Sequence, residues 1–305
     1  MAGLSSKGRN EKGKIVMFRA LLRPTNRRVR LLVGLFLAGL FCVQCTRTEA
    51  FRESRHILTI SAQDFGQSDP EAVSELEKLA KQDHIALLEY CLDNYRRNYS
   101  DFTCTFSKEE RINGIAKVEQ EIEVKHMTSP FSVAMAWIKN PPIGDRVIYV
   151  EGKNDDQMTV RPKSPLLQAL TGGAVLRKPD GPEAMRNTLR PVSMFGFGRG
   201  MQSLLDVYRQ AKQVGDLTTA FGGYADVAGQ ECLVLIRYLP AKDDYPAYKT
   251  LVYVDVDHLI PACIEAYDWD ENLQCRYVYR DLKFNVGLTD DDFTPEANEI
   301  KVAKK

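Results

Sequence analysis

Residues 102–127 read FTCTFSKEERINGIAKVEQEIEVKHM, and this stretch decides the fold class of the chain. Residues 102–107 alternate apolar with hydroxyl-bearing side chains, the two-residue period of a β-strand that has one apolar face. Asn113-Gly114 follows and is a strong hairpin signal, because both residues tolerate the positive φ angles of a two-residue turn. The pattern predicts a long antiparallel hairpin whose second strand runs over residues 115–127, with Val118 on its apolar face.

More strands are predicted on the C-terminal side of this hairpin. Residues 131–137 place Phe131, Val133, Met135 and Trp137 on one face and small side chains on the other. Strands so close in sequence pair antiparallel, because a parallel crossover takes a dozen or more residues. The other expected strands are 146–151, 157–160, 231–239, 248–256, 259–267 and 273–284.

Helical periodicity occurs before the hairpin and again in the middle of the chain. One helix is expected to begin at Asp69-Pro70 and a second to span residues 85–95. Residues 162–200 are irregular, with a short helix predicted around residues 166–170. An amphipathic helix follows at residues 201–208. Its apolar residues are Met201, Leu204, Leu205 and Tyr208.

Runs of strands with separate helices indicate an α+β fold rather than repeated βαβ units. A sheet of eight or nine antiparallel strands twists and curls. We therefore expect a curled antiparallel sheet, an unclosed half-barrel, with helices covering its concave face. The expected organisation is a signal segment at 1–50, a linker at 51–69, the half-barrel domain at 70–295 and a polar tail at 296–305.

The N-terminal segment has the parts of a secretory signal. Basic residues precede the uncharged run LLVGLFLAGLFCV at 31–43, and small residues allow cleavage before Phe51. As a helix this run spans about 20 Å, less than the roughly 30 Å hydrocarbon core, which favours a cleaved signal over a permanent anchor. Cys42 and Cys45 lie where a lipoprotein carries its acylated cysteine, but neither follows a small residue, so lipidation is less favoured. Met17 is an alternative start. We expect export to the periplasm or cell envelope.

The charge distribution disfavours nucleic acid as a partner. The 305-residue chain has zero net charge, but its first 50 residues hold ten basic and two acidic residues, so the rest is acidic. Phosphate binding needs clustered Lys and Arg. Membrane contact is expected only through an uncleaved or lipidated N-terminus.

The cysteines beyond residue 50 form no C-x-x-C pair and are interpreted as small buried apolar residues, with a disulfide as the alternative in an exported protein. They are Cys91, Cys104, Cys232, Cys263 and Cys275.

Signals of catalysis are weak. Asp255 and Asp257 are expected on one face of a strand end and His258 on the other, which favours a solvated strand end over a metal site. The glycines of residues 196–200 are interpreted as a flexible entry to a lid helix rather than as a phosphate site. The alternating charges of residues 108–111 are interpreted as cross-strand ion pairs. No Gly-x-Ser-x-Gly motif occurs. We expect no catalytic residue, metal or cofactor.

Six short motifs occur in this order along the chain: Tyr99–Cys104, Lys108–Arg111, Asn113-Gly114, Val124-Lys125, Ser129–Val133 and Tyr149–Gly152. Together they resemble a bacterial exported family known as domain of unknown function 1571, over roughly residues 70–295. Two further motifs, Asp255-x-Asp257-x3-Pro261 and Leu288-x4-Phe293, make that family similar to LolA/LolB-type lipoprotein carriers and RseB-like sensor domains. The resemblance implies an unclosed barrel with a helical lid over an apolar groove, which binds acyl chains in the carriers, and no catalytic residues.

The bulky face of residues 131–137 and the apolar stripe of the 201–208 helix are the candidate ligand-binding site. We expect the helix to lie over the strand, because each has an apolar surface to bury. The predicted function is an exported, non-enzymatic binding protein that holds a lipid or lipidated partner in this groove. The alternative is a protein-docking or envelope-sensor module without a small-molecule ligand. The candidate residues are Phe131, Val133, Met135, Trp137, Met201, Leu204, Leu205 and Tyr208.

Overall fold

The predicted hairpin turn is confirmed. In the computed structural model, which describes residues 70–301, β1 (Asp101–Ile112) and β2 (Ile115–Ala116) are joined by Asn113 and Gly114 alone. Their φ angles are 51° and 76°, both positive as a two-residue hairpin of this type requires. The predicted signal segment 1–50 and linker 51–69 lie outside the described residues.

The prediction that the hairpin returns as a single strand is wrong. It is divided into β2 and β3 (Gln120–Met127), with three residues of irregular backbone between them. Arg111 pairs with Ala116 but Lys108 pairs with Gln120, so the return side carries one extra residue. Such a bulge turns the following side chains to the other face. Val118, expected on the apolar face, is accordingly 70% exposed.

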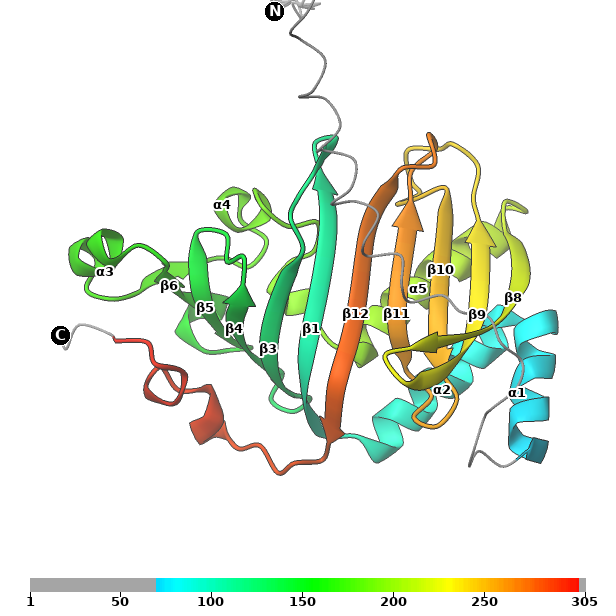
Figure 1. Ribbon diagram of the computed structural model, residues 1–305, viewed down its shortest axis with the longest axis horizontal. Coiled ribbons are helices and arrows are strands. Elements are labelled where there is room, and N and C mark those ends of the chain that lie inside the picture. The colour runs from blue at the N-terminus through cyan, green and yellow to red at the C-terminus, as the bar shows by residue number, and fades with distance from the viewer. Residues whose placement is uncertain (1–69, 302–305) are drawn as a thin grey trace, which may run out of the picture. The chain divides into compact units, whose positions relative to one another are not determined.

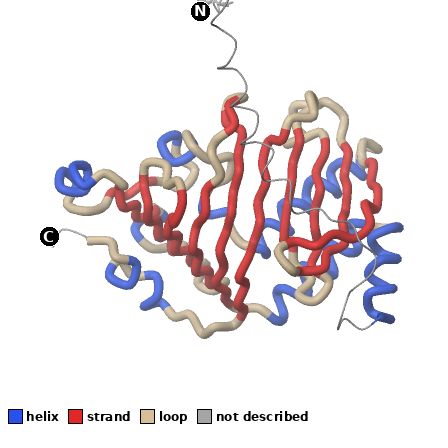
Figure 2. Tube along the Cα trace, viewed as in Figure 1, coloured by secondary structure: helices blue, strands red, loops and turns tan. Residues whose placement is uncertain are grey.

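All strand pairs are antiparallel, and together the strands form one twelve-stranded sheet that does not close (Figure 1). Along the sheet the order is β7-β6-β5-β4-β3-β1-β12-β11-β10-β9-β8. The pairing of β1 with β12 joins the N-terminal and C-terminal halves, and the tube trace shows the strands as one continuous layer (Figure 2). The remaining strands are β4 (Ser132–Lys139), β5 (Gly144–Val150), β6 (Met158–Pro162), β7 (Val175–Arg177), β8 (Thr218–Val227), β9 (Gln230–Tyr238), β10 (Lys249–Asp255), β11 (Pro261–Tyr267) and β12 (Leu273–Phe284).

The two edge strands, β7 and β8, were not predicted. β8 contains Gly222-Gly223, a pair typical of loops, and its register shifts there against β9. Gly222 lies close against β9, where a Cβ atom would be 2.9 Å from Val234 Cγ1. Half of the residues of β8 are exposed, as suits an edge strand, and its sequence has no regular apolar alternation.

The main helices lie on one face of the sheet, as predicted for this α+β fold. The Phe197 ring of α5 lies 4.9 Å from Phe102 on β1 and 4.7 Å from Tyr279 on β12. Figure 1 shows α2 and α5 crossing behind the sheet. The helices are α1 (Pro70–Gln82), α2 (His84–Asn98), α3 (Pro165–Thr171), α4 (Pro182–Met185) and α5 (Phe197–Gln213), with 3-10 turns η2 (Asn154–Asp156), η3 (Val192–Met194), η4 (Asp290–Phe293) and η5 (Glu296–Asn298). No helix within residues 70–301 is long and apolar enough to cross a bilayer.

The C-terminal segment packs on part of the opposite face of the sheet, at β4 and β5. Phe293 and Ile300 form an apolar cluster with Ala134 and Ile148 of the sheet. Ile300 is only 3% exposed, so residues of the expected polar tail contact the sheet. The domain boundaries given above remain a proposal.

The interpretation of the five cysteines as small buried residues is confirmed. Cys91, Cys104, Cys232, Cys263 and Cys275 are all buried and free. Burial raises the pKa of the Cys91 thiol to about 12 and that of Cys275 to about 11, so neither is a ready nucleophile. Cys42 and Cys45 lie outside the described residues.

Candidate ligand-binding cavity

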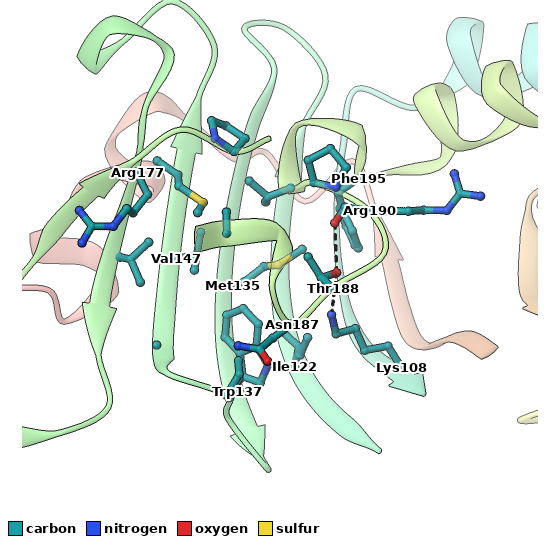
Figure 3. Close-up of a pocket in the computed structure, with 18 of the residues that line it drawn as sticks. Lys108, Ile122, Met135, Trp137, Val147, Arg177, Asn187, Thr188, Arg190 and Phe195 are labelled. Atoms are coloured by element: carbon teal, nitrogen blue, oxygen red, sulfur yellow. Dashed lines mark hydrogen bonds between the residues drawn. The ribbon is translucent and has the colours of Figure 1, made fainter. Parts of the chain in front are cut away.

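A partly open cavity of about 450 Å³ lies between the sheet and the segment that follows α3. Its floor is built by β12, β1, β3, β4, β5 and β6, and its roof by residues 179–196. Ligand cavities commonly have volumes of this size and mainly apolar walls. The apolar side chains of the floor are Phe106, Ile122, Met135, Trp137, Val147 and Val160, several of which Figure 3 shows pointing toward the roof.

Three of the eight predicted site residues line this cavity: Met135, Trp137 and Leu204. The Trp137 side chain is held in place by a 2.7 Å hydrogen bond from its indole N–H to Gln120 Oε1. Met135 and Trp137 share a face of β4, and Leu204 comes from α5, so this strand and this helix both contribute to the cavity wall.

The other five predicted residues are buried in the core and do not line the cavity. Arg199 covers the Phe131 ring, with its Cζ 3.6 Å from the ring centre. The guanidinium of Arg237 lies over the Tyr208 ring at 4.9 Å. Each of these two rings therefore packs against a cation, a placement that strand and helix periodicity does not reveal. The five are Phe131, Val133, Met201, Leu205 and Tyr208.

The roof is the irregular segment rather than the helix that was expected to hinge as a lid. Gly196 has a φ of 93°, and a Cβ there would lie 2.6 Å from His126 Nε2. A Cβ at Gly198 would lie 3.3 Å from the Tyr95 ring. These glycines allow close packing of α5 on its neighbours, and the helix is part of the core. The roof instead contributes Pro179, Ala184, Pro191, Val192 and Phe195 to the cavity wall.

A buried polar group on β1 ties this roof to the floor. The Glu110 carboxylate accepts hydrogen bonds from the Tyr277 hydroxyl at 2.7 Å and the Leu189 backbone N–H at 3.3 Å. Lys108 Nζ donates to Glu110 at 3.1 Å and to the Thr188 hydroxyl at 3.1 Å. Burial, followed by the nearby Cys275 and Glu110, raises the pKa of Tyr277. Lys108 and Glu110 pair along one strand, so the expected cross-strand pairing is wrong for them.

Four cationic side chains line the cavity against two carboxylates. Both carboxylates are paired: Glu110 with Lys108, and Glu183 with Arg177. Arg186 and Arg190 lie on the roof with exposed side chains, and neither forms an ion pair with any described residue. Figure 3 shows Arg177 and Arg190 at opposite ends of the lining. The cavity therefore combines an apolar floor with a net positive rim.

The Asp255 and His258 region differs from its prediction. Asp255 is buried and accepts hydrogen bonds from the backbone N–H groups of Asp257 and His258. His258 Nδ1 lies 3.0 Å from Asp255 Oδ2, so these two side chains meet rather than point to opposite faces. The chain turns immediately after β10, which ends the strand alternation. Within the described part of the chain, no group of three His, Cys, Asp or Glu residues is arranged to hold a metal.

The chain is similar to several solved structures but to no curated protein sequence. No curated protein matches the chain significantly. The MucB chain in the Pseudomonas aeruginosa MucA/MucB complex is similar over 73% of this chain, with 15% identity and a TM-score of 0.43. The match covers 64% of that chain, so this protein spans less than two thirds of its length.

Two further solved structures are similar at low identity. A LolA superfamily protein from Nitrosomonas europaea has 12% identity and a TM-score of 0.31, with 70% of this chain and 97% of that chain covered. The Mycobacterium tuberculosis lipoprotein LppX has 10% identity and a TM-score of 0.33, with 73% and 99% covered. The family described as "Protein of unknown function (DUF1571)" matches residues 99–302, and the chain belongs to this family.

Proposed function

We propose that this protein is an exported, non-enzymatic binding protein that holds an acyl chain of a lipid or lipidated partner in the cavity. The observation that carries the proposal is the apolar cavity of about 450 Å³ between the sheet and its roof. An apolar chain released from water into such a space gains free energy in proportion to the apolar area it buries. Export rests on the predicted signal at residues 1–50.

The polar groups of the cavity support binding rather than catalysis. No His or Cys lines it among the described residues, and the Glu110 carboxylate is occupied by Tyr277, Leu189 and Lys108. The unpaired Arg186 and Arg190 suit an acidic headgroup at the rim. Met135, Trp137 and Leu204 are proposed to contact the ligand, with Phe131, Val133, Met201, Leu205 and Tyr208 as the packed wall behind them.

The test uses Trp137 as a reporter. The chain has two tryptophans, so Trp269→Phe leaves Trp137 as the sole source of emission. Titration with palmitate should change this emission saturably. In the same background, Ala184→Phe should weaken palmitate binding at least tenfold, because Ala184 lines the cavity and a phenyl ring would occupy it. Ala184→Ser is the matched control and should bind like the parent.

Two results would contradict the proposal. One is an emission that no fatty acid or lysophospholipid changes, together with no co-purified lipid in native mass spectrometry. The other is equal palmitate binding by the Ala184→Phe and Ala184→Ser variants. Either would leave the protein-docking module as the function to pursue.

A further inference from the structure

The short helix α3 presents leucines to solvent next to the cavity. Leu166 is 69% exposed, Leu170 is 74% exposed and Leu167 is 42% exposed, and α3 has no buried residue. Each exposed leucine costs free energy that burial would recover. Exposed apolar side chains gathered in one place mark an interaction site more often than scattered ones do.

Hydrogen bonds and close packing hold the helix in a fixed position, so its exposed leucines also have fixed positions. Gln168 Nε2 donates a 2.7 Å hydrogen bond to the Pro162 carbonyl, and the Gly173 N–H closes the helix on the Gln168 carbonyl at 2.7 Å. Gly173 also lies directly against the Lys301 backbone, where a Cβ would be 2.0 Å from the carbonyl oxygen.

Basic residues lie on both sides of α3 in the chain, although the chain beyond residue 50 is acidic overall. Residues 157–179 contain four basic residues and no acidic one, and Asp180 follows directly. Arg161 forms an ion pair with Asp145, and Arg177 forms one with Glu183. Lys163 and Lys178 are exposed and form no ion pair with any described residue. Leucines flanked by free lysines complement a surface that is apolar inside and anionic outside, which is the surface of an anionic bilayer.

The position of α3 connects this surface to the cavity. Leu167 and Thr171 line the cavity, whereas Leu166 and Leu170 do not. Figure 1 shows α3 at one end of the sheet, beyond β6. A bilayer in contact with the exposed leucines would therefore lie at the end of the cavity that α3 closes.

We propose that α3 docks the protein on an anionic phospholipid bilayer, with Leu166 and Leu170 inserted among the acyl chains and Lys163 and Lys178 at the headgroups. This goes beyond the proposed function, because a carrier could load its ligand without touching a membrane. A helix of seven residues is about 10 Å long, too short to form most of a stable protein interface, which favours a lipid surface over a protein partner.

The experiment measures vesicle binding by the exported protein as purified from cells. Wild-type protein should co-sediment with vesicles of 7:3 phosphatidylcholine to phosphatidylglycerol, and less with phosphatidylcholine alone or at high salt. The double variant L166S/L170S should bind the anionic vesicles at least tenfold more weakly. The control I115S/V118S replaces two equally exposed aliphatic residues at the hairpin tip and should bind like wild type.

A second measurement excludes an effect of the N-terminal segment. Tryptophan placed by Leu170→Trp should be quenched by brominated acyl chains in the vesicles, whereas Ile115→Trp should not. L166S/L170S should still bind palmitate in solution, so that failure of docking and failure of the cavity proposal are distinguishable. Equal vesicle binding by L166S/L170S and wild type, no quenching of the Leu170→Trp emission, or capture of a protein but no vesicle through these leucines would overturn the inference.

Discussion

His126 shows how neighbouring rings can fix a single buried side chain. It stacks on Phe102 at 4.7 Å, and its Nδ1 is buried with no hydrogen-bond partner. Gly196 lies so close that no other residue could stand there. Burial first, and the nearby Arg199 second, lower the pKa of His126 from 6.5 to about 3. The ring is therefore neutral in the folded protein.

This lowered pKa makes stability depend on pH. The unfolded chain takes up a proton at His126 below about pH 6.5 and the folded chain does not until about pH 3, so stability is present above 6.5 and is lost as pH falls toward 3. We predict that wild type loses about 2 kcal/mol more than His126→Gln between pH 7.5 and pH 5. Urea unfolding across this range measures the difference. Parallel curves for the two proteins below pH 6.5 would show that His126 is protonated in the folded state.

At the scale of elements, the hairpin between β1 and β2 is set by local backbone conformation. Gly114 has a φ of 76° and nothing within 4 Å of where a Cβ would stand, so a side chain there meets no steric obstacle. Any change in stability must then come from the positive φ angle.

We predict that Gly114→Val lowers the free energy of unfolding by about 1–2 kcal/mol, because a β-branched residue resists the left-handed conformation. Asn113→Gly is the control and should change stability far less, since glycine adopts the same φ freely. Denaturant unfolding of the three proteins gives the values. A Gly114→Val variant as stable as wild type would mean that the turn rearranges into a longer loop.

At the scale of the whole molecule, the cavity depends on the contact between the roof and the sheet. Glu110 makes this contact through Leu189 of the roof and Tyr277 of the floor. The carboxylate is also the partner of Lys108, whose side chain is largely buried. Removing one member of a buried ion pair costs roughly 3 kcal/mol, because the other charge stays without compensation.

We predict that Glu110→Gln loosens the roof and speeds ligand release. Hydrogen exchange should quicken in residues 186–192 while the central strands keep their protection, and palmitate should leave faster in stopped-flow measurements of Trp137 emission. Glu109→Gln is the matched control, as the adjacent residue of β1 on its other face. Unchanged exchange in the roof of Glu110→Gln would mean that the Pro and Phe side chains hold it without this contact.

Local sequence patterns were enough to predict the α+β class, the antiparallel pairing, the Asn113-Gly114 turn and the apolar stripe of α5. These follow from periods of two and about four residues and from short connections, all of which are local. The edge strand β8 could not be predicted, because its glycine pair is explained only by the close approach of β9. The bulge that exposes Val118 depends likewise on a partner strand.

The location of the cavity could not be predicted from local patterns and follows from tertiary packing. Met135 and Trp137 share a face with Phe131 and Val133, and periodicity treats all four alike. Arg199 packs on the Phe131 ring, whereas Met135 lines the cavity beneath the roof of residues 179–196. A cavity forms where side chains that are distant in sequence leave a gap between them in the folded chain. Local sequence periodicity carries no information about such a gap. The roof could not be predicted for the same reason. Its sequence is irregular, and it forms a cavity wall only because it packs over the sheet.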